Sequence, residues 1–258
     1  MMARYQVILA YDGAHFLGSQ RQAKPDGSSL SRPRTVQGEL EKALHKIGWS
    51  GSSILLAGRT DTGVHATGQV AAFDLEWSHT DNELLHALNA VLPADLAVRG
   101  VRVTAADFHP RFDATSRTYC YRLFCQPIRD PLREHLAWRV WPAVDGEILG
   151  NVAAHFIGTH DFAAFGSPTG SKGTTVRTVM KASWRQVEDE WQFEVQANAF
   201  LYRMVRRLVF VQVAVAQGRL PAEAVARSLA EQAEVPKGSD LPAGLAPAHG
   251  LTLVEVTY

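Results

Sequence analysis

The strongest restriction on the fold comes from an order of strands and helices that occurs twice along the chain. The first half has the order β-α-β-β-α-β, with its segments at residues 4–10, 36–47, 53–57, 69–75, 81–91 and 97–103. The second half repeats this order at residues 117–125, 146–157, 178–187, 191–197, 200–217 and 251–257, and it adds a helix at 221–233. This is the order of the ferredoxin-like split βαβ unit. The sequence therefore predicts an α+β protein of two duplicated ferredoxin-like, RRM-like halves, residues 1–107 and 108–258, with a mixed, mostly antiparallel sheet.

Apolar stripes and stop signals support the two helices of the first half. Residues 36–47 have apolar side chains at three- and four-residue spacing, and Gly48 follows as a stop. Residues 84–92 form a similar stripe that ends before Pro93. Each stripe predicts one helix face packed against a sheet.

The charge balance limits the partners that the chain can bind. Among its 258 residues, 26 are Lys or Arg and 26 are Asp or Glu, which gives a net charge of zero. A strongly cationic nucleic-acid coat is therefore excluded, and only local patches could bind phosphate. The longest apolar stretch, residues 208–216, is interrupted by Gln212 and has about half the length of a membrane span. We expect no association with a membrane.

The cysteines and the N-terminus predict a cytoplasmic protein. The first residues have no basic start, apolar stretch and small-residue cleavage site in series, so we do not expect secretion. Cys120 and Cys125 lie five positions apart in a predicted strand, and this odd offset puts them on opposite faces. A disulfide or zinc pair between them is not expected, and free thiols suit a reducing compartment.

Two stretches rich in glycine, proline and serine, residues 22–34 and 166–175, are predicted to be loops. Both contain basic side chains. They could be solvated linkers, or they could clamp a substrate.

The most unusual segment, residues 57–68, lies between two predicted strands and contains one carboxylate, Asp61. Threonines and glycines flank Asp61, which suits close backbone approach to a ligand and hydrogen bonds that keep the carboxylate ionised. An Asx-type turn that closes a hairpin would use the same residues.

Asp61-Thr62-Gly63 is also the triplet of aspartic proteases. That chemistry needs two carboxylates that share a proton, from two such triplets or from a dimer. Only one triplet occurs here, and Arg59 precedes it. A neighbouring guanidinium would hold the carboxylate as an anion, which is the opposite of a shared-proton pair.

Three arginines lie in the apolar segment from Phe200 to Phe210. Arg203 and Arg207 are four positions apart and share one face of the predicted helix, whereas Arg206 shares a face with Tyr202 and Phe210. A buried Arg206 would need an acidic partner, and this helix offers none.

The chain resembles the tRNA pseudouridine synthase A family at motifs that run in the family's order over essentially its whole length. The matching motifs are Tyr11-Asp12-Gly13, Gln20-Arg21-Gln22, Thr35-Val36-Gln37, residues 58–66, Leu88-Asn89, Leu92-Pro93, residues 108–114, Arg117-Thr118-Tyr119, residues 158–162, Arg177-Thr178-Val179, Asn198-Ala199-Phe200, Met204-Val205-Arg206 and Gly250-Leu251. The sequence departs from the family at Ser19, where Trp is usual, and at Phe210, where Gly is common. The loop at residues 22–34 looks longer than usual.

The resemblance implies a pseudouridine synthase fold with a central catalytic cleft, in which the first half contributes the catalytic aspartate. It implies an isomerase that converts uridine to pseudouridine at positions 38, 39 and 40 of the tRNA anticodon stem-loop, without a cofactor or metal. By its match, Asp61 is the essential aspartate, which attacks the ribose or the base or removes the ribose C2′ proton. Arg206 matches the basic residue of the family's active site, and we expect it within about 4 Å of Asp61.

The second half is expected to contribute the tyrosine, the arginine helix and the dimer-forming elements. Tyr119 matches a residue whose ring stacks on the target uracil and whose hydroxyl could move the C5 proton. Leu251 matches an aliphatic residue that lines the uracil pocket, although a core leucine would look the same. Arg59 resembles the arginine that holds the flipped nucleotide, or it is a second ion-pair partner of Asp61. No metal site is expected at His65 or at His160-Asp161, because neither has a neighbouring cluster of ligands.

The resemblance also implies a homodimer in which one tRNA spans both subunits. Basic residues from several segments are candidates for phosphate contacts: Arg32, Arg34, Arg111, Arg117, Lys172, Arg203 and Arg207. A non-catalytic RNA-binding module is the alternative from another class of function. The sequence lacks the Gly-Phe-rich strand motif of RRM modules.

Overall fold

The structure is a computed structural model that describes residues 2–21, 33–168, 170, 173–230 and 241–258. The chain divides into two compact units. The first unit contains Met1–Thr115 and Thr252–Tyr258, and the second contains Ser116–Leu251. No helix in the described part of the chain is long and apolar enough to cross a membrane.

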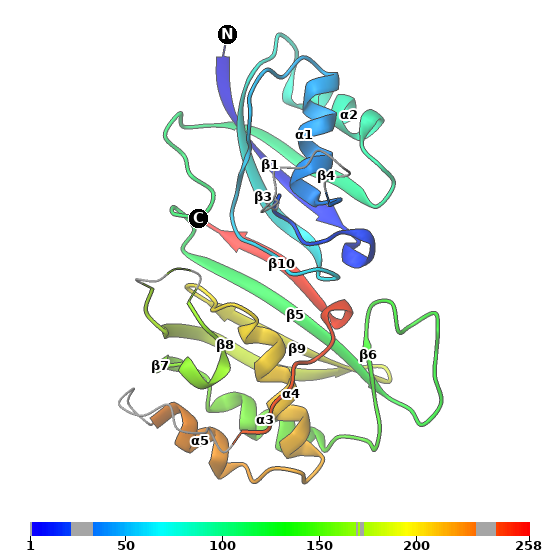
Figure 1. The fold of residues 1–258 in the computed structure, drawn as a ribbon, viewed down its shortest axis with the longest axis vertical. Helices are drawn as coiled ribbons and strands as arrows, with labels where there is room; N and C mark the ends of the chain where they lie inside the picture. The colour runs from blue at the N-terminus through cyan, green and yellow to red at the C-terminus, as the bar shows by residue number, and fades with distance from the viewer. Residues whose placement is uncertain (1, 22–32, 169, 171–172, 231–240) are drawn as a thin grey trace. The chain divides into compact units, whose positions relative to one another are not determined.

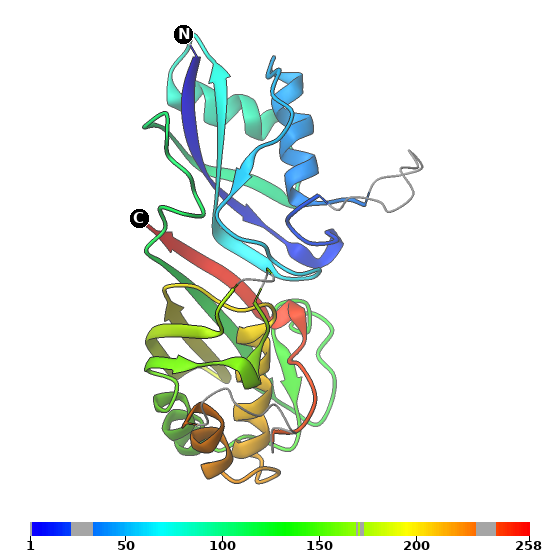
Figure 2. The ribbon, with the colours of Figure 1, turned by 60° about the vertical axis from the view of Figure 1, so that its left-hand side comes forward.

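The first unit is a sheet with two helices on one face (Figures 1 and 2). Its strands are β1 (Met2–Tyr11), β2 (Leu55–Leu56), β3 (His65–Glu76), β4 (Leu96–Thr104) and β10 (Leu251–Thr257). The strand order β4-β1-β3, with β2 also paired to β3, is that of a ferredoxin-like unit, and all of these pairs are antiparallel. Strand β10 runs parallel to the start of β3.

Capping and apolar burial account for the two helices, α1 (Val36–Lys46) and α2 (Asp81–Val91). Helix α1 begins after Thr35, whose side chain accepts a hydrogen bond from the amide of Gly38. Helix α2 begins with a capping box between Thr80 and Glu83. The predicted apolar stripes are buried on both helices: Val36, Leu40, Ala43 and Leu44 on α1, and Leu84 and Leu88 on α2.

The second unit has the strand order β5-β9-β8-β7, with β6 parallel to β5. Its strands are β5 (Ser116–Cys125), β6 (Trp138–Val140), β7 (Gly158–Asp161), β8 (Val176–Val187) and β9 (Glu190–Ala197). Its helices, α3 (Gly146–Ala154), α4 (Met204–Ala216) and α5 (Glu223–Ala230), gather on one side of this sheet (Figure 1). Three short 3₁₀ helices complete the fold: η1 (Gly13–His15), η2 (Ala163–Phe165) and η3 (Ala248–Gly250).

Helix α4 is the centre of the second unit's core. Ten of its residues are buried, including Gln212, the one polar residue in its longest apolar stretch. The Gln212 side chain accepts a hydrogen bond from Trp184 Nε1 at 2.7 Å and donates one to the carbonyl of Leu208 at 3.1 Å. Because both ends of the amide are satisfied, the helix can be buried at this position.

The structure confirms the expected α+β class and the mostly antiparallel sheet. It corrects the predicted helix at 200–217, which begins only at Met204 because Arg203 has φ +62°, outside the helical range. Tyr202 instead forms a bridge with Ser167, so it does not share a helix face with Arg206. The predicted elements do not include β6 and β7. Of the predicted helix at 221–233, residues 223–230 are helical and the last three lie outside the described residues.

Candidate active site

The candidate catalytic carboxylate, Asp61, lies in a tight turn of the segment that joins β2 to β3. We call residues 57–64 the signature loop. The carbonyl of Asp61 accepts a hydrogen bond from the amide of Val64 at 3.1 Å, and Gly63 has φ +79°. A left-handed residue at this place in a turn favours glycine. The turn therefore fixes the backbone on the C-terminal side of Asp61, which is itself half-buried.

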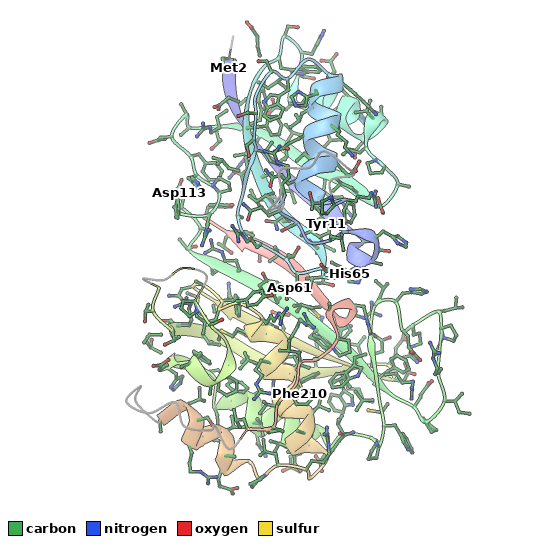
Figure 3. The ribbon with its side chains drawn as sticks, viewed as in Figure 1. Met2, Tyr11, Asp61, His65, Asp113 and Phe210 are labelled. Carbon is green, nitrogen blue, oxygen red and sulfur yellow. The ribbon has the colours of Figure 1, made fainter. Side chains whose placement is uncertain are left out.

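A buried phenol supports the loop on the other side of Asp61. Tyr11, at the end of β1, shares a hydrogen bond of 2.9 Å with Thr60 Oγ1. Gln69 reaches the same loop from β3 by donating to the carbonyl of Gly58 at 3.1 Å. Burial raises the pKa of Tyr11 to about 12, so its hydroxyl stays protonated at neutral pH. Figure 3 shows Tyr11, Asp61 and His65 at the same end of the first unit.

His65 and η1 close the loop against β1. The amide of Gly13 donates to His65 Nδ1 at 3.0 Å. Asp12 Oδ1 lies 3.1 Å from the same nitrogen. A Cβ atom on Gly13 would lie 2.1 Å from the carbonyl oxygen of Val64, so only glycine permits this approach. His65 thus braces the loop, and the described residues contain no group of three candidate metal ligands.

Two candidate residues for the uracil pocket belong to the second unit, and each lies at or near the start of a strand. Tyr119, near the start of β5, is half-buried, and its ring meets that of Phe200 edge-on with centroids 5.0 Å apart. Leu251, the first residue of β10, is buried. It directly follows η3, where Gly250 is packed against the ring of Tyr121.

Arg206 is held by the segment at residues 241–247, which we call the strap. Arg206 Nε donates to the carbonyl of Ala246 at 2.8 Å, and the amide of Ala246 donates to the carbonyl of Arg206 at 3.1 Å. The hydroxyl of Tyr121 fixes the end of the strap by donating to the carbonyl of Pro247 at 2.9 Å. The Arg206 side chain is half-buried and anchored at Nε.

Arg207 binds the strap rather than facing solvent. Its guanidinium donates to the carbonyl oxygens of Leu241, Pro242 and Gly244. Burial lowers the pKa of Arg207. Both terminal nitrogens of Arg207 donate hydrogen bonds to carbonyl oxygens of the strap, so Arg207 holds the strap against α4 in this conformation.

The other candidate phosphate contacts differ in exposure. Arg111 and Arg203 are exposed, and the Arg203 guanidinium lies 4.6 Å from the ring centre of Tyr202. Arg117 donates to the carbonyl of Asn198 at 2.9 Å. Arg34 forms two bonds of 2.7 Å with Asp95, and this pairing lowers the pKa of Asp95. Arg32 and Lys172 lie outside the described residues.

The structure assigns each expected site residue to one of the two units. Arg59, which is exposed, and Asp61 share the signature loop, whereas Tyr119, Arg206 and Leu251 lie in the second unit. Sequence patterns assign no role to the residues that support the signature loop, or to those that hold Arg206 in place. Tyr11 stands out only as part of a motif, and the strap has no periodic pattern that could mark it.

The chain matches the sequence profile of the tRNA pseudouridine synthase family at residues 7–113 and 152–258. It belongs to this family, and it is therefore an isomerase of the pseudouridine synthase class. Among relatives named tRNA pseudouridine synthase A, it is 38% identical to that of Limosilactobacillus fermentum, with 100% of this chain and 96% of the relative covered. It is also 38% identical to that of Paraburkholderia xenovorans (100% and 90% covered) and 39% identical to that of Chloroflexus aurantiacus (100% and 89% covered).

A solved structure described as a Cbf5-Nop10-Gar1 complex shows 13% identity to the chain. The match covers 96% of this chain and 48% of that one. Its TM-score of 0.36 is too low to define a shared fold.

Proposed function

We propose that the chain isomerises uridine to pseudouridine at positions 38, 39 and 40 of the tRNA anticodon stem-loop, with Asp61 as the catalytic carboxylate and no cofactor. The observation that carries this proposal is the bracing of the signature loop. Thr60 is bonded on one side of Asp61, and the turn to Val64 is closed on the other. A carboxylate on such a loop is preorganised for attack or for proton removal. The names of the relatives, which specify tRNA, support the substrate.

The reaction breaks one bond and forms another at the same ribose carbon. The N1–C1′ bond of uridine breaks, the uracil turns, and C5 bonds to C1′. C5 then loses its proton and N1 gains one, so that the product has the composition of the substrate. In this scheme Asp61 acts while the first bond breaks, as a nucleophile towards ribose or base or as the base that takes the C2′ proton.

The remaining candidate residues bind and orient the uridine. Tyr119 is proposed to stack on the uracil, because its ring is half-buried and already supported edge-on by Phe200. Leu251 supplies an apolar wall. Arg206, whose Nε is anchored on the carbonyl of Ala246, is proposed to pair with Asp61 and keep it ionised.

A uridine in a stem must leave its stack before any side chain reaches C1′, at a cost of a few kcal/mol. Arg59 is exposed on the signature loop, which suits a role in holding the flipped nucleotide. Exposed Arg111 and Arg203, with Arg117, are candidates for the surrounding phosphates. Recognition through phosphates and shape is compatible with three target positions in different sequences. A tRNA substrate and two free thiols suit a cytoplasmic location.

We also propose a homodimer, because the segment between β5 and β6 exposes large apolar side chains. These side chains are Ile128 (78% exposed), Leu132 (88% exposed) and Leu136, and Trp141 directly after β6 is exposed as well. Arg133 fixes this segment to the β8–β9 turn through ion pairs with Asp189 and Glu190. An apolar surface presented on a fixed segment suits contact with a second copy.

Tritium release from uridine C5 tests the reaction and its positions together. Each of three tRNA transcripts would contain 5-tritiated uridine at only one of positions 38, 39 and 40, with cytidine at the other two. We expect all three to release tritium when mixed with the chain. A transcript with labelled uridine only outside the anticodon stem-loop is the control. Release from the control alone, or binding without any release, would refute the proposal, and the second result would indicate an RNA-binding module.

A further inference from the structure

We propose that Ser19 is a positioning residue for Asp61, acting through the backbone of Thr60. This inference depends on the proposed catalytic role of Asp61. Ser19 belongs to the segment between η1 and α1, and it is fully buried. The sequence marks Ser19 only as a departure from the family, in which Trp is usual at this position, and gives it no role in the site.

Two hydrogen bonds of opposite direction join Ser19 to Thr60. The amide of Ser19 donates to the carbonyl of Thr60 at 3.1 Å, and the amide of Thr60 donates to Ser19 Oγ at 2.8 Å. The remaining polar atom of Thr60, Oγ1, shares a hydrogen bond with the hydroxyl of Tyr11. Every polar atom of Thr60 therefore has a partner, and Ser19 provides two of the three contacts.

Helix α1 holds Ser19 in place from the other side. The amides in the first turn of a helix have no partner within the helix. Here the amide of Gln37 donates to the carbonyl of Ser19 at 2.9 Å, and that of Val36 donates to the carbonyl of Gly18 at 3.4 Å. Gly18 has φ +86°, and a Cβ atom on it would lie 3.0 Å from the Thr60 carbonyl oxygen. The segment is thus fixed between the start of α1 and the signature loop.

The Ser19 hydroxyl is the only side-chain contribution to this link, so it can be removed without disturbing the backbone bonds. Thr60 is 7% exposed. If the Ser19 hydroxyl were removed, the amide of Thr60 would be a buried donor without its acceptor. We expect the loop to relax so that this amide finds another acceptor. Asp61 is the next residue, and a displacement of its carboxylate by about 1 Å is enough to slow a reaction up to about 100-fold.

The test compares Ser19→Ala, which removes the acceptor, with Ser19→Thr, which keeps a hydroxyl. Single-turnover release of tritium from a transcript labelled at uridine 39 measures the chemical step, and titration of the same transcript measures binding. We expect Ser19→Ala to lower the single-turnover rate constant about 10- to 100-fold with its tRNA affinity unchanged. We expect Ser19→Thr to remain within about threefold of the wild type. All measurements use temperatures at which circular dichroism shows each variant fully folded.

Ser228→Ala is the matched control, because Ser228 also loses one hydrogen bond, to the carbonyl of Ala224 in α5. Its rate should equal that of the wild type. A wild-type rate in Ser19→Ala would overturn the proposal, as would a loss confined to tRNA affinity, or a Ser19→Thr rate as low as that of Ser19→Ala. Asp61→Asn in the same assay separates the two claims. If Asp61→Asn stays active, the catalytic role proposed for Asp61 is wrong. If Asp61→Asn is inactive while Ser19→Ala reacts at the wild-type rate, only the role proposed for Ser19 is wrong.

Discussion

At the scale of single residues, the signature loop depends on polar groups that are buried and fully bonded. Tyr11 is the clearest example, because its hydroxyl is buried and bonded to Thr60. A buried phenol resists ionisation, which is why the pKa of Tyr11 is raised to about 12. The protonated form is therefore the one that stabilises the fold.

Tyr11→Phe is expected to lower the free energy of unfolding by about 1 kcal/mol at pH 7, because Thr60 Oγ1 loses its partner. The raised pKa adds a pH dependence. The stabilisation by Tyr11 is complete below the unfolded pKa of about 10 and is lost as the pH rises through about 12. Urea unfolding at pH 7, 10 and 11 should show a smaller alkaline loss of stability in the variant. Equal losses in the two proteins would contradict this account of Tyr11.

Tyr119 allows the ring and the hydroxyl to be tested separately. We expect Tyr119→Phe to bind tRNA as the wild type does, because the ring and its contact with Phe200 remain. If the hydroxyl moves the C5 proton, tritium release should slow by about 100-fold or more. Tyr119→Leu should impair binding of the flipped uridine as well. A Tyr119→Phe rate equal to that of the wild type would limit the role of Tyr119 to stacking.

At the scale of elements, sequence patterns predict the regular parts well and the irregular parts poorly. The limits of α2 and β10 agree with the predicted 81–91 and 251–257. A capping box marks the start of α2, and an apolar pattern marks β10. Strands β6 and β7 have three and four residues, too few for an alternation to appear. Residues 200–203 have a helical pattern, but the pairing of Tyr202 with Ser167 overrides it.

The same distinction applies to the site. The residue types of the signature loop are enough to mark Asp61 as a candidate. Its supports cannot be found in this way, because Ser19 and Tyr11 lie 41 and 49 positions from Thr60. Contacts at such separations depend on strand pairing and on the path of the chain between elements, and no local pattern encodes either.

The strap gives a prediction at this scale, because Gly244 is packed against the ring of Phe210. Phe210, labelled in Figure 3, is one of the two residues that depart from the family. Gly244 has φ +145°, and a Cβ atom on it would lie 2.3 Å from the ring. We expect Gly244→Ala to destabilise the second unit by about 2–4 kcal/mol, through backbone strain and overpacking together. Gly218→Ala is the matched control, since Gly218 has φ +68° but no atom within 4 Å of the added Cβ. Equal losses of stability in urea unfolding would show that packing against Phe210 contributes nothing.

At the scale of the whole molecule, a net charge of zero means that tRNA affinity must come from local contacts. The logarithm of affinity should fall linearly with the logarithm of salt concentration, with a slope that reflects a handful of phosphates. Arg203→Glu should reduce that slope by about one, because Arg203 is exposed. Arg207→Glu should instead destabilise the strap, whose carbonyl groups bind the guanidinium.

Salt titrations of the two variants, together with their unfolding curves, check this distinction. If the salt dependence of tRNA affinity in Arg203→Glu has the same slope as in the wild type, Arg203 does not contact a phosphate. A protein that remains monomeric at micromolar concentration, and yet binds tRNA with an unchanged slope in Arg203→Glu, would show that the proposed dimer is wrong.

The proposed function requires Asp61 to drive the conversion of uridine to pseudouridine. Its most direct test is single-turnover tritium release from tRNA by Asp61→Asn beside the wild type, with tRNA binding and unfolding measured on both. The amide has nearly the same shape as the carboxylate, but at neutral pH it is neither a nucleophile nor a base. We predict that Asp61→Asn folds and binds tRNA as the wild type does and releases no tritium. Release at a rate within about tenfold of the wild type would contradict the assignment.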